Sequence, residues 1–422
     1  MNSDKMKLLV AEAVVALTPT FTQIDLQVKD NLERVLQAFR DRRVGAHHFA
    51  SVSGYGHGDM GRDVLDEVFA QVMGAESAAV RVQFVSGTHA IACCLFGILR
   101  PLDELLSVVG APYDTLEEVI GYPLTSESQG TAYSGSLKDF GITYRQVELT
   151  AEGGVNWEAL AKAVKPQTRM VLIQRSCGYA WRESLSIADI ERIIKLVKQQ
   201  NPSTVCFVDN CYGEFISDRE PTAVGADIIA GSLIKNPGGT IATAGGYVAG
   251  KAEYVELAAQ RLTAPGIGRE GGATFDLNRL LFQGLFLAPQ MVGEAMKSSQ
   301  LAAYVFDKLG YEVKPKPFEP RRDIIQAIQL GSPEKLIEFC RNLQRFSPID
   351  SYVDPIPGGM PGYVSQLVMA GGTFIDGSTL ELSADGPLRE PYTVFLQGGT
   401  HWTHLAIALE NFKLENLKLI EP

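Results

Sequence analysis

The central region of the chain, residues 78–249, alternates short apolar runs with longer amphipathic segments. This alternation constrains the fold more than any other feature of the sequence. The apolar runs are short and rich in β-branched residues, so we interpret them as buried strands. Strands are predicted at residues 78–84, 104–109, 143–149, 170–174, 205–209, 227–230 and 246–249, and helices at 63–73, 88–99 and 187–199. This order predicts an α/β fold with a mostly parallel sheet covered on both faces.

The segments before and after this region have other patterns. Over residues 1–45 apolar side chains recur on one helix face, so this segment is predicted to be helical. Beyond residue 311 the sequence is richer in proline and glycine. Further helices are expected at 277–309 and 403–412, and further strands at 367–369, 380–382 and 393–395. We therefore predict three parts, which are an N-terminal helical segment (1–55), a large domain (56–290), and a long helix with a smaller C-terminal α+β domain (291–422).

The composition argues against several classes of protein. The chain carries 38 lysines and arginines against 49 acidic residues, a net charge of −11, with no long basic block. Nucleic acid and anionic membranes are therefore not expected as partners. We find no run of about eighteen apolar residues, so no membrane span is expected either. The six cysteines form no Cys-x-x-Cys pair, and with the polar N-terminus they indicate a cytoplasmic protein with free thiols.

One lysine stands out because it follows a predicted buried strand. The strand, Ala226-Asp227-Ile228-Ile229-Ala230, leads into Lys235, and Pro237-Gly238-Gly239 comes soon after. Burial disfavours the charged form of a lysine, lowers its pKa and makes the amine a nucleophile, as Schiff-base chemistry requires. The glycines let the backbone approach a bulky group. We interpret Lys235 as the residue that carries pyridoxal phosphate (PLP), and the alternative is a surface lysine in a glycine-rich turn.

Other features suit the same cofactor. The segment Val85-Ser86-Gly87-Thr88-His89-Ala90 opens a helix directly after a strand, so it suits a phosphate group, although a simple capped turn would have the same pattern. Asp209 ends its strand, where a carboxylate can keep a pyridine nitrogen protonated, cap a turn or bind a metal. Tyr113 has a ring that can lie on the cofactor or pack at the surface. Ser232 has a hydroxyl group for the phosphate.

Several motifs, taken in order, resemble those of a known family. They are Gly54-Tyr55-Gly56, Val85-Ser86-Gly87, Gly87-Thr88-His89-Ala90, Leu99-Arg100-Pro101-Leu102-Asp103-Glu104, Pro112-Tyr113-Asp114-Thr115, Gln174-Arg175-Ser176 and Glu381-Leu382-Ser383-Ala384-Asp385-Gly386-Pro387. With them, nearly the whole chain resembles the aluminium-resistance or methionine-γ-lyase-like branch of the cystathionine β-lyase group. These are fold-type I PLP-dependent enzymes, so the resemblance implies that transferase-like fold and PLP as cofactor.

The resemblance also implies roles for individual residues. Lys235 would be the Schiff-base lysine, Asp209 would contact the pyridine nitrogen, and Tyr113 would lie on the ring. The phosphate would be held by Ser86, Gly87, Thr88 and Ser232. The substrate would be a small amino acid.

Tyr55, by the same resemblance, would reach the phosphate of a neighbouring subunit. A homodimer or homotetramer with shared active sites is therefore expected. The sequence departs from the family at three positions. His57 stands where the lyases have arginine, with Arg62 as a candidate to compensate, and Ile234 and Thr88 replace a hydroxyl residue and a methionine.

Two arginines are candidates for binding the substrate carboxylate, because a guanidinium group offers a bidentate fork. Arg389 is the first candidate and Arg175 the second, and an ordinary surface ion pair is the alternative for Arg389. His401 and His404 have helical spacing, but no third ligand is evident, so no metal site is predicted.

These expectations define a PLP-dependent carbon–sulfur lyase acting on cystathionine, methionine or cysteine by β- or γ-elimination. In this interpretation Lys235 removes the Cα proton, a thiol leaves, and hydrolysis gives a 2-oxo acid and ammonia. Two alternatives remain open. The same residues suit aldol cleavage, transamination or racemisation, and the aluminium-resistance branch leaves room for a non-catalytic metal-stress protein on a PLP fold. Specificity depends on pocket shape, so the pattern does not choose among the three substrates.

Overall fold

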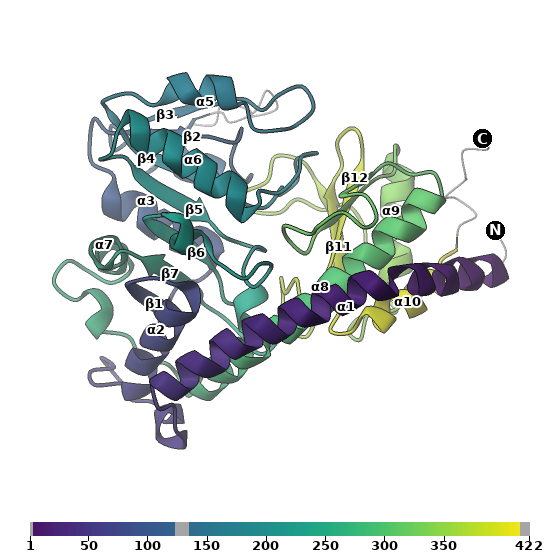
Figure 1. Ribbon diagram of the computed structural model, residues 1–422, viewed down its shortest axis with the longest axis horizontal. Helices are drawn as coiled ribbons and strands as arrows, with labels where there is room; N and C mark the ends of the chain where they lie inside the picture. Colours follow the sequence, from purple (N-terminus) through teal and green to yellow (C-terminus); the bar gives the residue numbers. More distant parts are fainter. Residues whose placement is uncertain (1–2, 123–134, 414–422) are drawn as a thin grey trace.

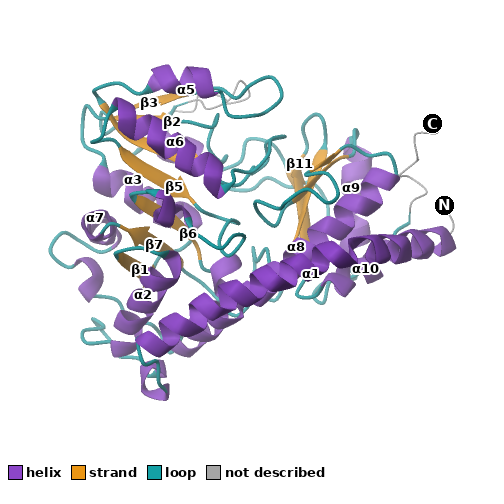
Figure 2. Ribbon diagram, in the orientation of Figure 1, coloured by secondary structure: helices purple, strands orange, loops and turns teal. Residues whose placement is uncertain are grey.

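The computed structural model describes residues 3–122 and 135–413 (Figure 1). Its strands form two groups at opposite ends of the molecule (Figure 2). Two long helices, α1 (Ser3–Asp41) and α8 (Asn278–Lys308), pack side by side and run past both groups. We call the two groups the large sheet and the small sheet.

The large sheet has the order β1-β7-β6-β5-β4-β2-β3. Neighbouring strands from β3 to β6 run parallel, whereas β7 runs antiparallel to both of its neighbours. The mostly parallel sheet predicted from the alternating pattern is therefore confirmed. Its strands are β1 (Ser77–Arg81), β2 (Glu104–Ser107), β3 (Thr143–Gln146), β4 (Thr168–Gln174), β5 (Val205–Asp209), β6 (Ile228–Ser232) and β7 (Gly246–Gly250).

Helices cover both faces of the large sheet, which is why its central strands are apolar throughout. Along β5, Cys206 and Val208 enter the core on the face of α6, whereas Val205 and Phe207 enter the core on the face of α3 and α7. This alternation follows from the two-residue period of a strand. The surrounding helices are α2 (Met60–Met73), α3 (Gly87–Ile98), α4 (Leu116–Ile120), α5 (Trp157–Ala163), α6 (Ile187–Gln200) and α7 (Ala252–Leu262).

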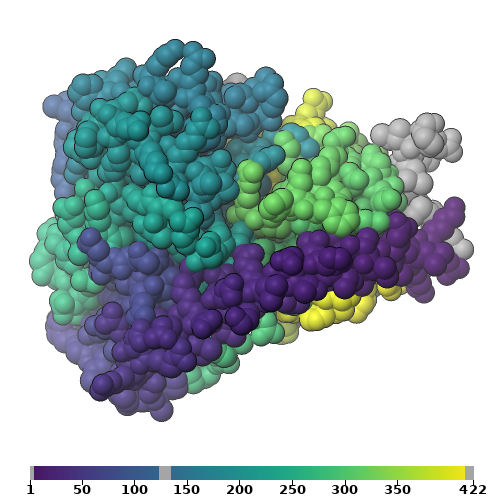
Figure 3. Space-filling model, in the orientation of Figure 1, coloured from purple at the N-terminus to yellow at the C-terminus, as the bar shows by residue number. Residues whose placement is uncertain are grey.

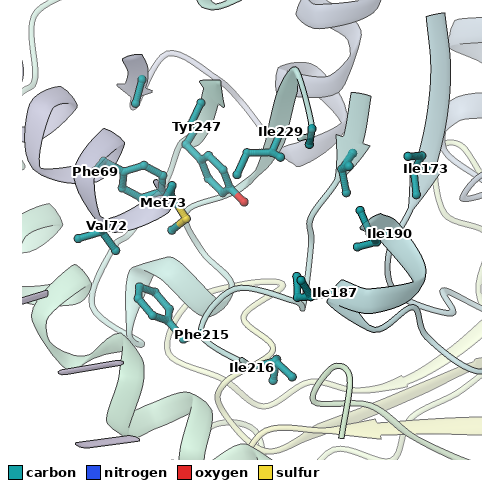
Figure 4. Packing of buried hydrophobic residues seen from close by; sticks show 14 of the residues in the cluster. Phe69, Val72, Met73, Ile173, Ile187, Ile190, Phe215, Ile216, Ile229 and Tyr247 are labelled. Carbon is teal, nitrogen blue, oxygen red and sulfur yellow. The ribbon is translucent and has the colours of Figure 1, made fainter. Parts of the chain in front are cut away.

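Figure 4 shows part of the core on the α6 face, with Phe69 beside Tyr247. The two rings have centroids 4.7 Å apart and planes inclined at 47°. The hydroxyl of Tyr247 is buried and donates to Oε1 of Glu214 at 2.6 Å. A polar pair therefore lies inside this apolar core, directly behind β6.

The small sheet is antiparallel and has the order β10-β11-β12-β9-β8. Helices α9 (Pro333–Gln344) and α10 (Trp402–Glu410) pack with α1 and α8 around it, and together they enclose a second apolar core. The strands are β8 (Val313–Lys314), β9 (Gln326–Gln329), β10 (Leu367–Ala370), β11 (Ser383–Pro387) and β12 (Thr393–Gln397).

Helices α1 and α8 each contribute to both cores. Met6 and Leu17 of α1 are buried in the small-sheet core, whereas Val35 of the same helix is buried in the large-sheet core. Figure 3 shows α1, in purple, lying along both parts of the molecule. Because α8 passes unbroken through residue 290, the division into 1–55, 56–290 and 291–422 stays a prediction.

Among the described helices, α1 is the one that is long and apolar enough, by length and composition alone, to cross a membrane. The sequence analysis did not expect any such segment. One face of α1 packs on α8 and on the small-sheet core, and 28% of its apolar window is buried. That no membrane partner exists stays a prediction.

Several sequence expectations about strands were wrong, including those at 104–109 and 143–149, which end at Ser107 and Gln146. The predicted strand at 380–382 is absent, and β11 begins only at Ser383. The carboxylate of Glu381 instead accepts hydrogen bonds from the backbone N–H groups of Phe374 at 2.9 Å and Ile375 at 3.3 Å. The side chain of Glu381 thus stabilises a loop at a position where the apolar pattern predicted a β-strand. The strand expected at 78–84 ends at Arg81, and β8 and β9 were not predicted.

Candidate active site

A pocket lies where β4, β5 and β6 reach their carboxyl ends, next to the first turn of α3. Ligands of open α/β sheets bind at this edge. We call it the inner pocket. It is lined by Ser86, Gly87, Thr88, Ile91, Tyr113, Thr115, Leu116, Gln174, Ser176, Gly178, Asp209, Cys211, Tyr212, Ser232, Ile234, Lys235, Tyr363 and Gly377.

Lys235 follows β6 by three residues and immediately precedes the short 3₁₀ turn Asn236–Gly238. Its Nζ donates to the carbonyl oxygen of Gly377 at 3.2 Å and lies 4.9 Å from the ring centroid of Tyr212. Burial lowers the pKa of Lys235, although nearby acidic groups, including Asp385 and Asp209, act in the opposite direction. The lowered pKa increases the fraction of neutral amine, which is the nucleophilic form.

Asp209 is the last residue of β5 and is buried in the same pocket. Its Oδ1 accepts a hydrogen bond from the backbone N–H of Cys211 at 3.1 Å. Burial raises the pKa of Asp209, while this hydrogen bond and the charge of Lys235 lower it. A cationic ring nitrogen beside Asp209 would likewise favour the ionised carboxylate.

The first turn of α3 provides a site suited to an anion. Ser86 caps the helix, because its Oγ accepts from the backbone N–H of His89 at 3.1 Å. Gly87 comes next, and a Cβ placed there would lie 3.3 Å from the Cβ of Ser232. Glycine therefore keeps this turn close to β6. The exposed N–H groups and the dipole of a twelve-residue helix favour a phosphate at this position.

Thr88 and Thr115 lie at the same end of the pocket, with their hydroxyl oxygens 2.9 Å apart. Tyr113 is close by and belongs to a group of aromatic rings. Its hydroxyl lies 2.7 Å from that of Tyr363, and its ring centroid lies 5.5 Å from that of Tyr179. Burial raises the pKa of Tyr113 well above its ordinary value, so this tyrosine is a proton donor and not a phenolate at neutral pH.

The structure therefore brings together most of the residues that the sequence predicted. These are Lys235, Asp209, Tyr113, Ser86, Gly87, Thr88 and Ser232. Their shared pocket does not by itself establish their roles, which stay predictions.

Arg175, the second candidate for binding the substrate carboxylate, does not lie in the inner pocket. Its side chain is 1% exposed and lines no part of the inner pocket. It donates to Oδ1 of Asn210 at 2.8 Å and pairs with Glu220 at 3.4 Å. Releasing a guanidinium group from a buried carboxylate is costly, so Arg175 is a structural residue here and is not placed to bind a substrate.

Arg389 lies outside the inner pocket but close to it. Its Nη1 is 3.6 Å from Oδ1 of Asp114, the residue after Tyr113. Both side chains of the pair are partly exposed. A role for Arg389 in binding the substrate stays a prediction.

Tyr55 does not line the inner pocket of its own chain. Tyr55 is 83% exposed and its ring lies beside that of His57, with centroids 5.7 Å apart. Arg62, proposed to compensate for His57, is buried and donates to the carbonyl oxygens of Gly56 at 2.7 Å and Gly272 at 3.1 Å. Arg62 therefore fixes the loop that carries Tyr55, and it is not placed to bind a phosphate. The role of Tyr55 across an interface stays a prediction.

The two histidines with helical spacing have separate partners. His401 caps α10 by accepting from the backbone N–H of Thr403, and Nε2 of His404 lies 2.7 Å from the carbonyl oxygen of Phe346. No group of three or more metal-ligating side chains occurs in residues 3–122 and 135–413.

Sequence reasoning missed several residues that line the inner pocket. Gln174 ends β4 as Asp209 ends β5, so the rule applied to Asp209 would have found it. Tyr212 and Tyr363 carried no recognisable signal, because they reach the pocket from loops. Asp385 does not line the inner pocket but interacts electrostatically with Lys235; it belongs to the motif Glu381–Pro387, and no role was predicted for it.

The fold and the site together define an α/β protein with a lysine-centred pocket at the carboxyl edge of its parallel strands. Comparison with known families identifies one family within this class of α/β proteins. The methionine γ-lyase family model matches residues 6–417. The chain belongs to the methionine γ-lyase family.

Similar proteins cover almost the whole chain. Protein YnbB of Bacillus subtilis is 45% identical over 408 residues, which are 97% of this chain and 96% of YnbB. A solved structure from Listeria monocytogenes, described as a candidate cystathionine β-lyase involved in aluminium resistance, is 46% identical. It has a TM-score of 0.91 and covers 98% of this chain and 100% of its own. A carbon–sulfur lyase involved in aluminium resistance from Clostridium novyi is 48% identical, with a TM-score of 0.90 over 97% and 95% of the two chains. The resemblance stated from the motifs is thus confirmed.

Proposed function

We propose that this protein is a PLP-dependent carbon–sulfur lyase of fold type I that acts on a sulfur-containing amino acid. The observation that carries the proposal is the convergence of three groups on one pocket. They are a lysine of lowered pKa, a buried carboxylate at a strand end, and the N-terminal turn of a helix. The family membership and the names of the similar proteins support the same chemistry.

The residues of the inner pocket fit this cofactor. The α3 turn with Ser86, Gly87 and Thr88 suits its phosphate, and Gly87 lies too close to Ser232 for a side chain to be added without adjustment. Oε1 of Gln174 is buried and has no partner in the described part of the chain, so a polar ligand group is expected against it. Asp209 supplies the carboxylate for the ring nitrogen, and Tyr113 an aromatic face.

PLP bound here would supply an electron sink for the carbanion formed at the substrate Cα. The chain would supply the rest of the chemistry. The amine of Lys235 removes the Cα proton, which its lowered pKa permits near neutral pH. The hydroxyl of Tyr113, kept protonated by burial, is a proton donor beside the departing sulfur. The balanced outcome for β-elimination consumes one water and yields a thiol, a 2-oxo acid and ammonia.

We further propose that the protein is cytoplasmic and that it works as a homodimer or homotetramer with active sites shared between subunits. The exposed position of Tyr55 supports the second point, because its own chain does not use it in the inner pocket.

The proposal is tested with the purified holoprotein and L-cystathionine, L-methionine and L-cysteine as separate substrates. We expect a 2-oxo acid and ammonia in equal amounts, together with one thiol or sulfide per turnover, and no products from Lys235→Ala. An aldehyde, an amino-group transfer product or a D-amino acid would instead support aldol cleavage, transamination or racemisation. No turnover of any amino acid would support a non-catalytic role.

A further inference from the structure

A second cavity, of about 420 Å³, continues from the inner pocket toward the small sheet. We call it the outer pocket. The two cavities are adjacent, because both are lined by Tyr113, Tyr212, Lys235, Tyr363 and Gly377. The additional walls come from β10, β11 and β12 and from the loops around residues 350–379. A substrate held at Lys235 would extend its far end into the outer pocket.

The outer pocket has an acidic lining. Three carboxylates line it, those of Asp350, Asp376 and Asp385, whereas Lys235 is its one basic residue. In residues 3–122 and 135–413, no arginine or histidine lines either pocket. The structure therefore offers no guanidinium group in this space for a substrate carboxylate.

Asp385 is the most enclosed of the three carboxylates, because the other two are exposed at the rim. It lies on β11, in register with Phe395 of β12, and its Oδ2 accepts from Nε2 of Gln397 at 3.4 Å. It interacts electrostatically with Lys235. Burial raises the pKa of Asp385 to about 6, and Lys235 is the first of the groups that oppose this rise. The carboxylate is thus ionised at neutral pH and close to one cation.

Two buried hydroxyl groups line the same cavity without a partner. They are Oγ of Ser378 and Oγ1 of Thr379, which find no partner among the residues that the structure describes and belong to residues that are each 3% exposed. Buried hydroxyl groups are rarely left without a hydrogen bond, so a polar ligand group is expected near them. This observation is independent of the charge of Asp385.

We propose that the outer pocket binds a primary ammonium group on the leaving half of the substrate and that Asp385 determines this specificity. The inference rests on the proposed function, in which the amine of Lys235 must be neutral to remove the Cα proton and therefore offers Asp385 no ammonium group when the substrate binds. A partly buried carboxylate without a countercharge is unfavourable, and a substrate ammonium restores the pair. The substrate class is a sulfur amino acid whose thiol fragment carries an amine.

The same site disfavours an anion at that position. A carboxylate on the leaving half would face Asp385 and the two rim carboxylates without a compensating cation, and like charges in a desolvated pocket repel strongly. In the reaction itself the Cβ–S or Cγ–S bond breaks, the sulfur takes the electron pair and a proton, and the fragment leaves as an aminothiol. Asp385 holds the ammonium group of that fragment and does not take part in the bond breaking.

The test uses three substrates of similar size that differ in the charge of the leaving half. S-(2-aminoethyl)-L-cysteine carries a cation, S-propyl-L-cysteine is its neutral counterpart, and S-carboxymethyl-L-cysteine carries an anion. The kcat/KM for 2-oxo acid formation is measured for the wild type, for Asp385→Asn, and for Glu390→Gln as a matched loss of one carboxylate. Glu390 is exposed on the turn after β11 and lines neither pocket.

We expect the wild type to prefer the cationic over the neutral substrate by about tenfold or more, the scale on which a charged hydrogen bond discriminates. Asp385→Asn should reduce this ratio to about one by raising KM for the cationic substrate, and Glu390→Gln should preserve it. Equal use of the cationic and neutral substrates by the wild type would overturn the inference while leaving the proposed lyase activity in place. An equal loss of preference in Glu390→Gln would overturn the assignment to Asp385.

A binding measurement separates this inference from the proposed function. L-lysine and L-2-aminoheptanoic acid match the cationic and neutral substrates in shape but have no sulfur to eliminate. Titration calorimetry on the wild-type holoprotein should show that L-lysine binds about tenfold more tightly than its neutral counterpart. This measurement requires no variant protein. If no sulfur substrate is cleaved, the lyase proposal fails, and the comparison of L-lysine with L-2-aminoheptanoic acid still decides whether the outer pocket selects a cation.

Discussion

Gln174 and Asp209 are register partners on the neighbouring parallel strands β4 and β5, and both side chains line the inner pocket that contains Lys235. On its other side Asp209 is in register with Ala230 of β6, the strand that leads to Lys235. The relative positions of Gln174 and Asp209 are therefore set by backbone hydrogen bonds between strands and not by loops. Groups held in this way need little reorganisation when charge develops during a reaction.

The first prediction concerns Asp209. Replacing Asp209 with Asn should leave bound PLP in place but lower kcat by about a hundredfold or more, the scale of loss when a preorganised electrostatic partner is removed. The reason is that a neutral amide cannot keep the ring nitrogen protonated. Absorbance measures the bound cofactor, and 2-oxo acid formation measures turnover. Near-normal turnover in Asp209→Asn would mean that the carboxylate is structural.

The second prediction concerns assembly. Tyr55→Phe and Lys235→Ala should each be impaired as homomers, because every site would contain one altered residue. Mixing the two should restore part of the activity, since some mixed dimers contain a site with both residues intact. Activity is measured after subunit exchange, which a tagged pull-down must show independently, and Tyr55→Phe must first prove impaired alone. Exchange without recovery of activity would mean that Tyr55 does not serve the partner's site.

Much of the large sheet and its pocket was predictable from the sequence. Buried parallel strands such as β5 have a continuous apolar run, and the residue at the end of such a run, Asp209 or Lys235, falls at the ligand-binding edge. The N-terminal turn of α3 carries its own signal, because Ser86 is a capping residue before an apolar helix.

The small sheet and its contribution to the site were less predictable. Tyr363 and Asp385 approach Lys235 only because the chain returns more than a hundred residues later. No local pattern encodes such a contact. The error at 380–382 has a local origin, since Glu381 accepts hydrogen bonds from the backbone of Phe374 and Ile375, a few residues earlier, instead of extending a strand. Arg175 was misjudged because its burial partner, Glu220, lies 45 residues away.

The third prediction concerns Glu214, which lies behind β6. Its side chain is fully buried, and its Oε1 accepts from Tyr247. Burial raises the pKa of Glu214 from 4.5 to about 8, and the neighbouring Glu220 contributes to the rise. The folded chain therefore keeps this proton up to about pH 8, whereas the unfolded chain releases it near pH 4.5. The contribution of this bound proton to the free energy of unfolding is fully present below pH 4.5 and is lost as the pH rises to about 8.

Glu214→Gln mimics the protonated side chain and should remove this pH dependence. The unfolding free energy of the wild type should fall relative to the variant by up to about 1.4 kcal/mol per pH unit across that window. Thermal unfolding at pH 5 and pH 8 measures the effect, with Glu390→Gln as a control. If the difference in Tm between Glu214→Gln and the wild type is the same at both pH values, the carboxyl group is not protonated in the folded chain.

The fourth prediction concerns the pH dependence of substrate choice. Asp385 faces the cation of Lys235, the hydroxyl groups of the surrounding tyrosines, the amide of Gln397 and the thiol of Cys340. The tyrosines are Tyr113, Tyr179, Tyr212 and Tyr363. Its carboxyl group is neutral below a pKa of about 6 and ionised above it. The preference for S-(2-aminoethyl)-L-cysteine over S-propyl-L-cysteine should therefore be small at pH 5 and complete by pH 8.

The measurement for this prediction is the ratio of kcat/KM values for the two substrates across pH 5 to 8. Taking the ratio removes pH effects that act on the chemistry common to both. The ratio of kcat/KM values reports the free enzyme, and a neutral Lys235 no longer lowers the pKa of Asp385, so the midpoint should lie at about pH 6 or above. A ratio that stays constant across the range would indicate that Asp385 does not contact the ammonium group.

The central claim of this account is that Lys235 carries PLP, and reduction with sodium borohydride tests it most directly. The purified protein should be yellow, and reduction should fix the cofactor irreversibly to a lysine that peptide mapping by mass spectrometry can identify. The account predicts the label on the peptide that contains Lys235, and no label in Lys235→Arg. A label on another lysine, or no label at all on the wild type, would contradict it.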